Sequence, residues 1–276
     1  MKKRLDVYLF EEGMVQSREK AQALIMAGLV YVNDQKSTKA GFQIKPDDFV
    51  VIRENPLPFV SRGGLKLQKA LESFGLKLKG LTCLDVGSST GGFTDCMLQA
   101  GAAKVYAVDV GYNQLAWSLR SDPRVVSLER VNFRHFDRKL IDNSNKIDFA
   151  SVDVSFISLS KILPSLSEIL EEGSLAVCLI KPQFEAGREK VGKKGVVREK
   201  STHVEVIENV LKFSFENSFK ALKLDYSPLK GPQGNIEYLL LLQKTSADTS
   251  ADTSSDCKDL IGDLVERAHE ELNGGS

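Results

Sequence analysis

The stretch Cys83-Leu84-Asp85-Val86-Gly87-Ser88-Ser89-Thr90-Gly91-Gly92-Phe93-Thr94 joins an apolar segment to a turn rich in glycine and serine. The apolar segment predicts a buried strand, and the residues after the turn predict the start of a helix. In a doubly wound sheet, a strand, such a turn and a helix follow one another where a nucleotide-like ligand binds. The spacing differs from G-x-G-x-x-G, so the dinucleotide fingerprint is not met.

Two carboxylates lie near this turn in the sequence. Asp85 stands two residues before Gly87, where it would suit the ammonium group of a methionine moiety better than a pyrophosphate. Residues 105–109 predict a second strand that ends in Asp109, and a carboxylate there can accept hydrogen bonds from ribose hydroxyls. Either piece alone would fit an ordinary α/β turn. Together, about 20 residues apart, they favour an adenosine-containing cofactor.

Between residues 61 and 244, apolar segments alternate with helical segments. This alternation predicts an α/β fold with a Rossmann-like, seven-stranded and mostly parallel sheet that helices cover on both faces. The strands are expected at residues 82–86, 104–108, 125–128, 148–152, 175–180, 219–225 and 237–242.

Residues 1–55 predict a separate small α/β domain. Leu5 and Leu9 have helical spacing, Ser17 is a candidate N-cap of a second helix, and Gly28 is placed to end that helix. Strands are expected at 29–32 and 49–52, with turns at 33–34 and 46–48. Two prolines then predict an extended linker over residues 56–65, so that the second domain would occupy residues 66–244.

The net charge of zero conceals an acidic C-terminal segment. Residues 245–276 contain eight acidic and two basic residues, so the rest of the chain carries an excess of about six positive charges. Such an excess suits a polyanionic partner, but it equally suits a solvated surface. The acidic residues 245–276 predict a flexible tail, which begins with the low-complexity linker 245–256. An amphipathic helix from Lys258 would need to dock through Leu260, Ile261, Leu264 and Val265.

Four residues form a candidate catalytic set. Asp153 and Lys181 each follow a predicted strand, at the edge where open parallel sheets bind their substrates. Glu237 begins another strand, and Lys66 lies on the helix that leads into the sheet. A lysine directly after the apolar segment 175–180 needs a partner, so a structural ion pair with Asp153 and a functional role are both open.

Other classes of function receive no support from the composition. No apolar run reaches the roughly 20 residues of a membrane span, and the basic N-terminus lacks the apolar region of a secretory signal. The four cysteines and three histidines match no metal-binding spacing, and the histidines are expected to be surface or packing residues. We therefore expect a cytoplasmic protein without a metal and without a membrane partner.

The quoted motifs resemble those of known families. The N-terminal sequence Arg4-Leu5-Asp6 … Ser17-Arg18-Glu19-Lys20-Ala21 … Leu24-Ile25-Met26-Ala27-Gly28-Leu29-Val30-Tyr31-Val32-Asn33 closely resembles the S4 RNA-binding domain. Residues 61–244 resemble the FtsJ-like ribose methyltransferases. The two parts, joined by Ser61-Arg62-Gly63-Gly64-Leu65-Lys66-Leu67, are together similar to the TlyA family.

This resemblance implies 2′-O-methylation of cytidine in ribosomal RNA, with S-adenosylmethionine as the methyl donor and ribosomal RNA or ribosomal subunits as partners. It implies a lysine–aspartate–lysine–glutamate catalytic set at Lys66, Asp153, Lys181 and Glu237. Cofactor contacts are implied for Gly87, Ser89, Gly91, Asp109 and Asn132, beside the expected role of Asp85. For the S4 domain, the expected contacts to RNA phosphates come from Arg4, Arg18 and Lys20.

Three alternatives to this function remain at the level of the sequence. The chain could be an RNA-binding protein without catalysis, or a methyltransferase of small molecules in which the S4 region serves only for docking. The family has also carried the label hemolysin, but no membrane-length segment or set of long alternating strands supports lysis.

Overall fold

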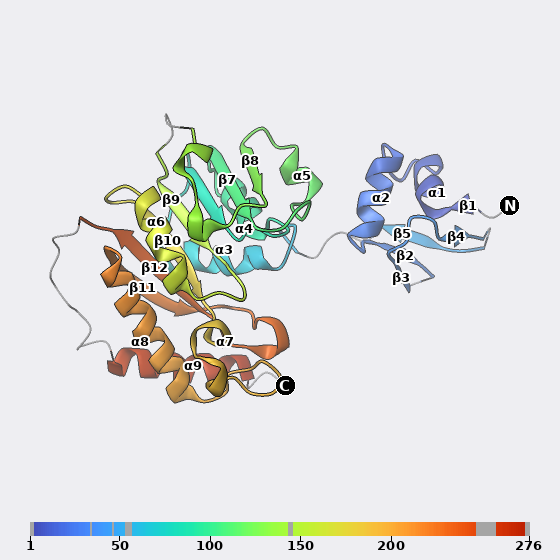
Figure 1. Ribbon diagram of the computed structural model, residues 1–276. Coiled ribbons are helices and arrows are strands. Elements are labelled where there is room, and N and C mark those ends of the chain that lie inside the picture. The colour runs from blue at the N-terminus through green and yellow to red at the C-terminus, as the bar shows by residue number, and fades with distance from the viewer. Residues whose placement is uncertain are drawn as a thin grey trace. The chain divides into compact units, whose positions relative to one another are not determined.

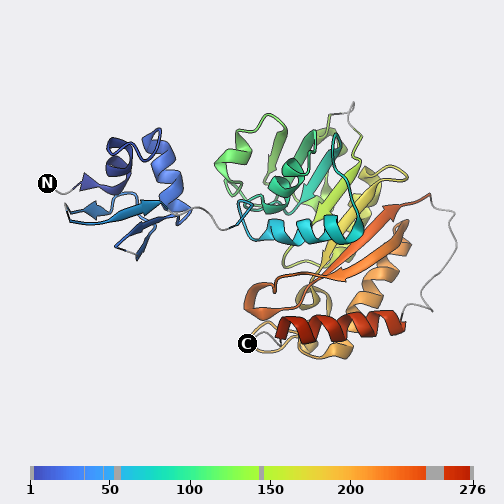
Figure 2. The same cartoon turned by 180° about the vertical axis from the view of Figure 1, so that it is seen from behind.

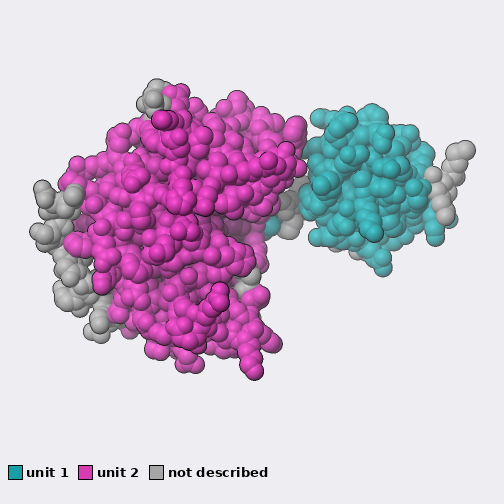
Figure 3. Space-filling view, in the orientation of Figure 1, with its two compact units in different colours: residues 1–58 teal, residues 59–276 magenta. Residues whose placement is uncertain are grey.

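The computed structural model describes residues 3–33, 35–45, 47–52, 57–142, 146–246 and 258–273. The chain divides into two compact units, Met1–Pro58 and Phe59–Ser276 (Figure 3). Each unit has its own buried apolar cluster and is described by itself. The predicted turns at 33–34 and 46–48 each include a residue outside the described ranges, as does the start of the predicted linker.

The N-terminal unit packs two helices against small antiparallel sheets (Figure 1). Its apolar cluster joins Leu5 and Leu9 of the first helix to Ala21 and Ile25 of the second. Ser17 caps the second helix as predicted, because its hydroxyl accepts the backbone N–H of Lys20 at 3.2 Å. The elements are β1 Lys3–Arg4, α1 Leu5–Glu11, α2 Arg18–Met26, β2 Val30–Val32, β3 Gln35–Ser37, β4 Gln43–Ile44 and β5 Val50–Ile52.

The larger unit contains the predicted seven-stranded sheet, in the order β11-β12-β10-β9-β6-β7-β8. The strands from β6 to β10 run parallel, and β12 pairs antiparallel with both β10 and β11. Each predicted segment is a strand within two residues of its expected ends. The strands are β6 Thr82–Val86, β7 Lys104–Asp109, β8 Val125–Glu129, β9 Phe149–Val152, β10 Leu175–Ile180, β11 Phe219–Tyr226 and β12 Tyr238–Lys244.

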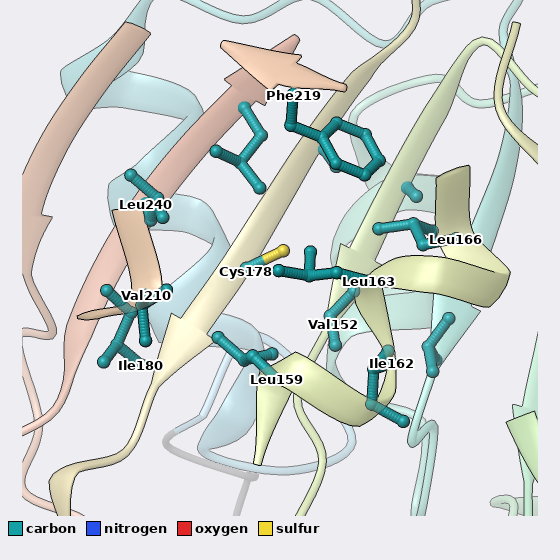
Figure 4. Close-up of a cluster of buried hydrophobic side chains, with 14 of the residues drawn as sticks. Val152, Leu159, Ile162, Leu163, Leu166, Cys178, Ile180, Val210, Phe219 and Leu240 are labelled. Carbon is teal, nitrogen blue, oxygen red and sulfur yellow. The ribbon is translucent and has the colours of Figure 1, made fainter. Parts of the chain in front are cut away.

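Helices cover both faces of this sheet, as Figures 1 and 2 show. One apolar cluster lies between the sheet and helices α3 and α4, and the other lies beneath α6, α8 and α9. Figure 4 shows part of the second cluster, where Leu163 of α6 lies beside Cys178 of β10. The helices are α3 Gly63–Phe74, α4 Gly92–Gln99, α5 Trp117–Arg120, α6 Leu163–Ile169, α7 Pro182–Glu185, α8 Lys200–Glu216 and α9 Lys258–Asn273, with short 3-10 helices at Phe133–His135, Arg138–Leu140, Leu159–Lys161, Arg188–Lys190 and Pro232–Gly234.

The described part of the predicted linker, residues 57–65, is only partly a linker. The larger unit already begins at Phe59, and α3 starts at Gly63 instead of residue 66. A Cβ on Gly64 would lie 2.3 Å from the Phe59 ring, so this ring packs directly onto the helix start. Gly64 therefore allows close packing here, where the sequence alone predicted an extended linker.

The acidic C-terminal segment ends in a docked helix, which corrects the expectation of a flexible tail for residues 258–273. Helix α9 packs against α8 (Figure 2), and Ile261, Leu264, Val265 and Ala268 are buried in the shared core. Leu260, which was expected on the same apolar face, is 68 % exposed. The low-complexity residues 247–257 lie outside the described ranges.

Replacing Leu264 by Ala is expected to lower the free energy of unfolding by about 2–5 kcal/mol, because the change opens a cavity between α8 and α9. The matched change Leu260→Ala removes an exposed side chain of the same helix and should shift it by about 0.5 kcal/mol or less. Urea denaturation followed by circular dichroism measures both. Equal losses in the two variants would contradict the docking of α9.

Candidate active site

The candidate site lies where the order of the strands reverses. The chain runs outward from β6 through β7 to β8 and then returns to β9 on the other side of β6. In open α/β sheets, ligands bind outside the carboxyl ends of the strands at this point. Gly87 follows β6 with φ +84°, and a Cβ there would lie 2.5 Å from the backbone oxygen of Asp153. Only glycine therefore allows the two strand ends to approach this closely.

Asp85 faces into the protein and supports the turn from inside. Its carboxylate is completely buried and accepts hydrogen bonds from the hydroxyls of Thr94 (2.6 Å) and Ser151 (3.0 Å). Burial raises the pKa of this carboxyl to about 6, although the two hydroxyls oppose the rise. In this position the Asp85 side chain bonds to Thr94 and Ser151 within the protein, and its contact with a ligand ammonium stays a prediction.

Asp109 is better placed to meet a ligand. Its two carboxylate oxygens accept the backbone N–H groups of Ser89 and Gly111, each at 2.7 Å. The side chain is half-buried, and each oxygen keeps lone-pair capacity for further donors. Ser89 is exposed in the glycine-rich turn and has φ +47°. The carboxylate thus ties the turn to the end of β7 and leaves a polar, accessible edge that fits ribose hydroxyls.

The two other residues expected near the cofactor also have local structural roles. Gly91 is the N-cap of α4 with φ +95°, and a Cβ there would lie 2.3 Å from Leu119. Asn132 is exposed beside the end of β8, and its side-chain oxygen accepts the backbone N–H of Arg134 at 3.1 Å. Both residues lie at the same edge of the sheet as Asp109.

The first buried ion pair joins Lys66 of α3 to Glu237. The Lys66 Nζ donates to Glu237 Oε2 at 2.5 Å, and the Gln183 amide donates to Oε1 at 3.3 Å. Glu237 is completely buried and Lys66 is 7 % exposed. A Cβ on Gly231 would lie 2.1 Å from Glu237 Oε1, so the backbone of Gly231 closes one side of the carboxylate.

The second ion pair joins Lys181 to Asp153. Lys181 also donates to the Ser155 hydroxyl at 3.1 Å. The register pairs Ile180 with Tyr238, which brings the next residue of each chain segment, Lys181 and Glu237, to the same edge of the sheet. The structure therefore brings all four predicted catalytic residues to one edge, and it contains the ion pair that the sequence left as an alternative.

An exposed aromatic residue beside this edge was missed at the sequence level. Phe156 has φ +63° and is 91 % exposed, and its ring lies 5.1 Å from the ring of Phe184. A bulky residue with positive φ is strained, and such strain gathers at functional sites. Phe184 also lines a hollow of about 300 Å³ together with Gln183, Gly187, Arg188 and Val191. The sequence shows the phenylalanine but neither its backbone angle nor its exposure.

In the N-terminal unit, Asp6 organises two of the three predicted RNA-binding residues. Its buried carboxylate accepts bonds from Arg4 (2.9 Å), Arg18 (3.1 Å) and Gln22 (2.9 Å). The Arg4 guanidinium, aided by Gln22 and Arg18, holds the pKa of Asp6 well below its usual range. Both guanidinium groups remain about half exposed, and Lys20 is exposed on the same helix as Arg18. Sequence reasoning missed the role of Asp6 in orienting this pair.

The described residues offer neither a membrane-spanning helix nor a cluster of metal-binding side chains. None of their helices has both the length and the apolar character that crossing a bilayer requires. Nowhere in the same ranges do three or more histidine, cysteine, aspartate or glutamate side chains gather as a metal site would need.

The raised pKa of Asp85 predicts a pH-dependent contribution to stability. A carboxyl whose folded pKa lies above its unfolded value contributes most below the unfolded value, and the contribution is lost as the pH rises through the folded value. The free energy of unfolding of the wild type relative to Asp85→Asn should therefore fall between about pH 4 and pH 7. Urea denaturation across this range measures the difference.

The matched variant Asp122→Asn removes a carboxyl whose pKa the Arg124 guanidinium lowers. The corresponding difference should be flat over the same pH range, because that carboxyl titrates at lower pH. A flat difference for Asp85→Asn as well would show that the buried carboxyl does not titrate there.

The comparisons with known proteins cover both units. Residues 59–244 match the model of the FtsJ-like methyltransferase family, and residues 3–50 match that of the S4 domain. The chain is 48 % identical to YqxC of Bacillus subtilis, a candidate rRNA methyltransferase, over 98 % of this chain and 95 % of that protein. It is 41 % identical to the 16S/23S rRNA (cytidine-2′-O)-methyltransferase TlyA of Mycobacterium tuberculosis, over 87 % of this chain and 89 % of the other.

A solved structure of a candidate hemolysin from Streptococcus thermophilus is 46 % identical. It superimposes with a TM-score of 0.75 over 99 % of this chain and 98 % of that chain. The matches thus extend across both units, and they join an S4 domain to an FtsJ-like domain in the order that the sequence motifs predict. The chain therefore belongs to the TlyA family.

Proposed function

We propose that this chain is an S-adenosylmethionine-dependent enzyme that methylates the ribose 2′-hydroxyl of a cytidine in ribosomal RNA. The observation that carries the proposal is that a buried and a partly buried lysine–carboxylate pair lie at one edge of the sheet, beside the glycine-rich turn at the strand-order reversal. The relatives that bear the name TlyA support the substrate class, because their names specify cytidine 2′-O-methylation of rRNA.

The residues around the glycine-rich turn fit the proposed cofactor. The accessible Asp109 carboxylate would accept the ribose hydroxyls, and the exposed turn at Gly87 and Ser89 would lie against the rest of the molecule. When bound, S-adenosylmethionine supplies an activated methyl group. The protein residues then have to position the acceptor hydroxyl and remove its proton.

Lys181 is the proposed general base. A ribose hydroxyl is a weak nucleophile at neutral pH, so its proton must leave as the oxygen takes the methyl group. The Lys181 Nζ, which is 7 % exposed, would accept this proton. Asp153 and Ser155 hold the Nζ in place, and Asp153 would stabilise the ammonium group that results.

Lys66 of α3 and Glu237, which directly precedes β12, would complete the catalytic set. The Glu237 carboxylate is enclosed by Lys66, Gln183 and the backbone of Gly231. This enclosure fixes the Lys66 ammonium next to the reaction edge, where it would orient the acceptor hydroxyl.

Phe156 is proposed to support the target base. An exposed aromatic ring beside the catalytic edge offers a stacking surface, and stacking on an aromatic side chain contributes about 1–3 kcal/mol per base. Sequence-specific RNA recognition targets bases that are free to unstack, which also exposes the ribose of the same nucleotide.

The first test measures transfer of a radiolabelled methyl group from S-adenosylmethionine to unmodified ribosomal RNA and ribosomal subunits. We expect label in a ribose that then resists alkaline cleavage. Lys181→Ala should lower turnover by about 10²–10⁴-fold, since the base is lost, while the affinity for the cofactor stays within about threefold. Lys220→Ala, a change to an exposed lysine of the edge strand β11, should leave turnover unchanged.

Near-normal turnover of Lys181→Ala would contradict the role of this lysine. Cofactor binding without transfer to RNA or either subunit would contradict the proposed substrate. RNA binding without any affinity for the cofactor would indicate an RNA-binding protein that lacks catalysis.

The S4 domain is proposed to supply affinity through phosphate contacts. Replacing Arg18 and Lys20 together by Gln should weaken RNA binding and reduce the slope of log K against log salt by about 1.5, since each phosphate contact contributes about 0.7–0.9. Filter binding over a range of salt concentrations measures this slope, with Lys220→Gln as the control. An unchanged slope would show that the domain meets RNA through another face.

A further inference from the structure

The start of strand β12 carries two consecutive buried residues that face opposite sides of the sheet. Glu237 contacts Lys66 of α3, and the following odd-numbered residues Leu239 and Leu241 lie in the apolar cluster of α3 and α4. Tyr238, with Leu240 and Leu242, lies in the opposite cluster beneath α8 and α9. Because side chains alternate along a strand, the anchoring of Tyr238 on one face sets the position of Glu237 on the other.

Tyr238 is anchored by a buried histidine. His203 of α8 is completely buried, its Nε2 lies 3.1 Å from the Val197 backbone oxygen, and its Nδ1 lies 2.8 Å from the Tyr238 hydroxyl. A carbonyl oxygen can only accept, so Nε2 carries the hydrogen and Nδ1 accepts the hydroxyl hydrogen of Tyr238. Burial lowers the pKa of His203 to about 4, so the ring is neutral near pH 7 and keeps this tautomer.

A second set of hydrogen bonds joins the loop before α8, which contains Gly195 and Val197, to the segment before β12. Asn235 is 2 % exposed, its side-chain oxygen accepts the Val197 N–H at 3.2 Å, and its amide donates to the Gly195 oxygen at 2.9 Å. The Gly231 N–H donates to the backbone oxygen of Asn235 at 2.8 Å. Val197 is therefore held from two directions: its backbone oxygen bonds to His203, and its backbone N–H bonds to Asn235. The loop and both flanks of Glu237 form one bonded unit.

Helix α9 covers this unit on its outer side. The His269 ring packs edge-on against His203, with centroids 4.8 Å apart. Glu266 pairs with Lys200 at the start of α8, and Lys230, next to Gly231, donates to Asn273 at 2.8 Å. The C-terminal helix thus contacts both the helix that carries His203 and the loop that encloses the Glu237 carboxylate.

We propose that His203 and Tyr238 are positioning residues that fix Glu237, and through it Lys66, and that α9 closes this support. The inference rests on the proposed function, because it assigns a purpose to the exact placement of a residue in the proposed catalytic set. Neither side chain touches the reaction edge: His203 acts through the Tyr238 hydroxyl, and Tyr238 acts through the backbone it shares with Glu237.

A double-mutant cycle tests the proposal in the full-length protein. Tyr238→Phe removes one hydroxyl and should lower kcat for methyl transfer to ribosomal RNA about tenfold, with the affinity for S-adenosylmethionine unchanged. In a Glu237→Gln background the same change should have almost no further effect, since its route passes through Glu237. Ser174→Ala is the matched control: it also removes one buried hydroxyl, which bonds to Ile147 O at the opposite end of the sheet, and should leave kcat unchanged.

Two outcomes would overturn the inference: an unchanged kcat in Tyr238→Phe, or the same tenfold loss whether or not Glu237 is present. A merely structural role predicts this second result, because a general loosening would add to the loss from Glu237→Gln. Wild-type turnover of Glu237→Gln itself would instead contradict the proposed catalytic set, and absence of transfer by the wild type would contradict the proposed function.

Substitutions at His203 give a second measurement that does not depend on Tyr238→Phe folding. His203→Gln keeps both a donor and an acceptor and should retain most of the turnover, whereas His203→Leu should lose about as much as Tyr238→Phe. Equal turnover in the two His203 variants, with both folded by circular dichroism, would overturn the proposal.

Discussion

The ion pair between Lys66 and Glu237 joins residues that are 171 positions apart, and the larger unit is arranged around it. A buried charge without a partner destabilises a protein by several kcal/mol, so neither residue can be buried at this place without the other. Lys66 lies on α3, which precedes the first strand of the unit, and Glu237 directly precedes β12, the last of its strands in the sequence. The pair therefore connects the two ends of the sheet-forming part of the chain.

The same edge concentrates features that ordinary packing would avoid. A lysine ends an apolar strand at Lys181, an aromatic residue has positive φ at Phe156, and two backbones meet without room for a side chain at Gly87. Each feature is unfavourable alone and is held in place by the well-packed clusters on both faces of the sheet. This contrast between a regular body and an irregular edge is what a binding site in an open α/β sheet looks like.

Much of this architecture could be predicted from local sequence patterns. The seven strands are confirmed, since all but the partly polar edge strand β11 are short and mainly apolar runs, and the Ser17 cap is confirmed because its chemistry is local. The orientation of Asp85 and the docking of α9 could not be predicted, since both depend on partners distant in sequence. Leu260 shows the limit clearly: helical spacing places it near the apolar stripe, but the width of the contact with α8 decides that it stays exposed.

Asp6, which accepts hydrogen bonds from both Arg4 and Arg18, lowers the entropy that these side chains lose when the N-terminal unit binds a ligand. Ordering a long side chain at an interface costs about 0.5–1.5 kcal/mol, and arginine is among the most flexible residues. Asp6 already restrains Arg4 and Arg18 in the folded domain, so much of that ordering takes place during folding rather than on contact with a polyanion. The two guanidinium groups stay about half exposed and are held at a fixed distance from each other. This arrangement favours a ligand whose negative charges have the same spacing over a ligand that is merely highly charged.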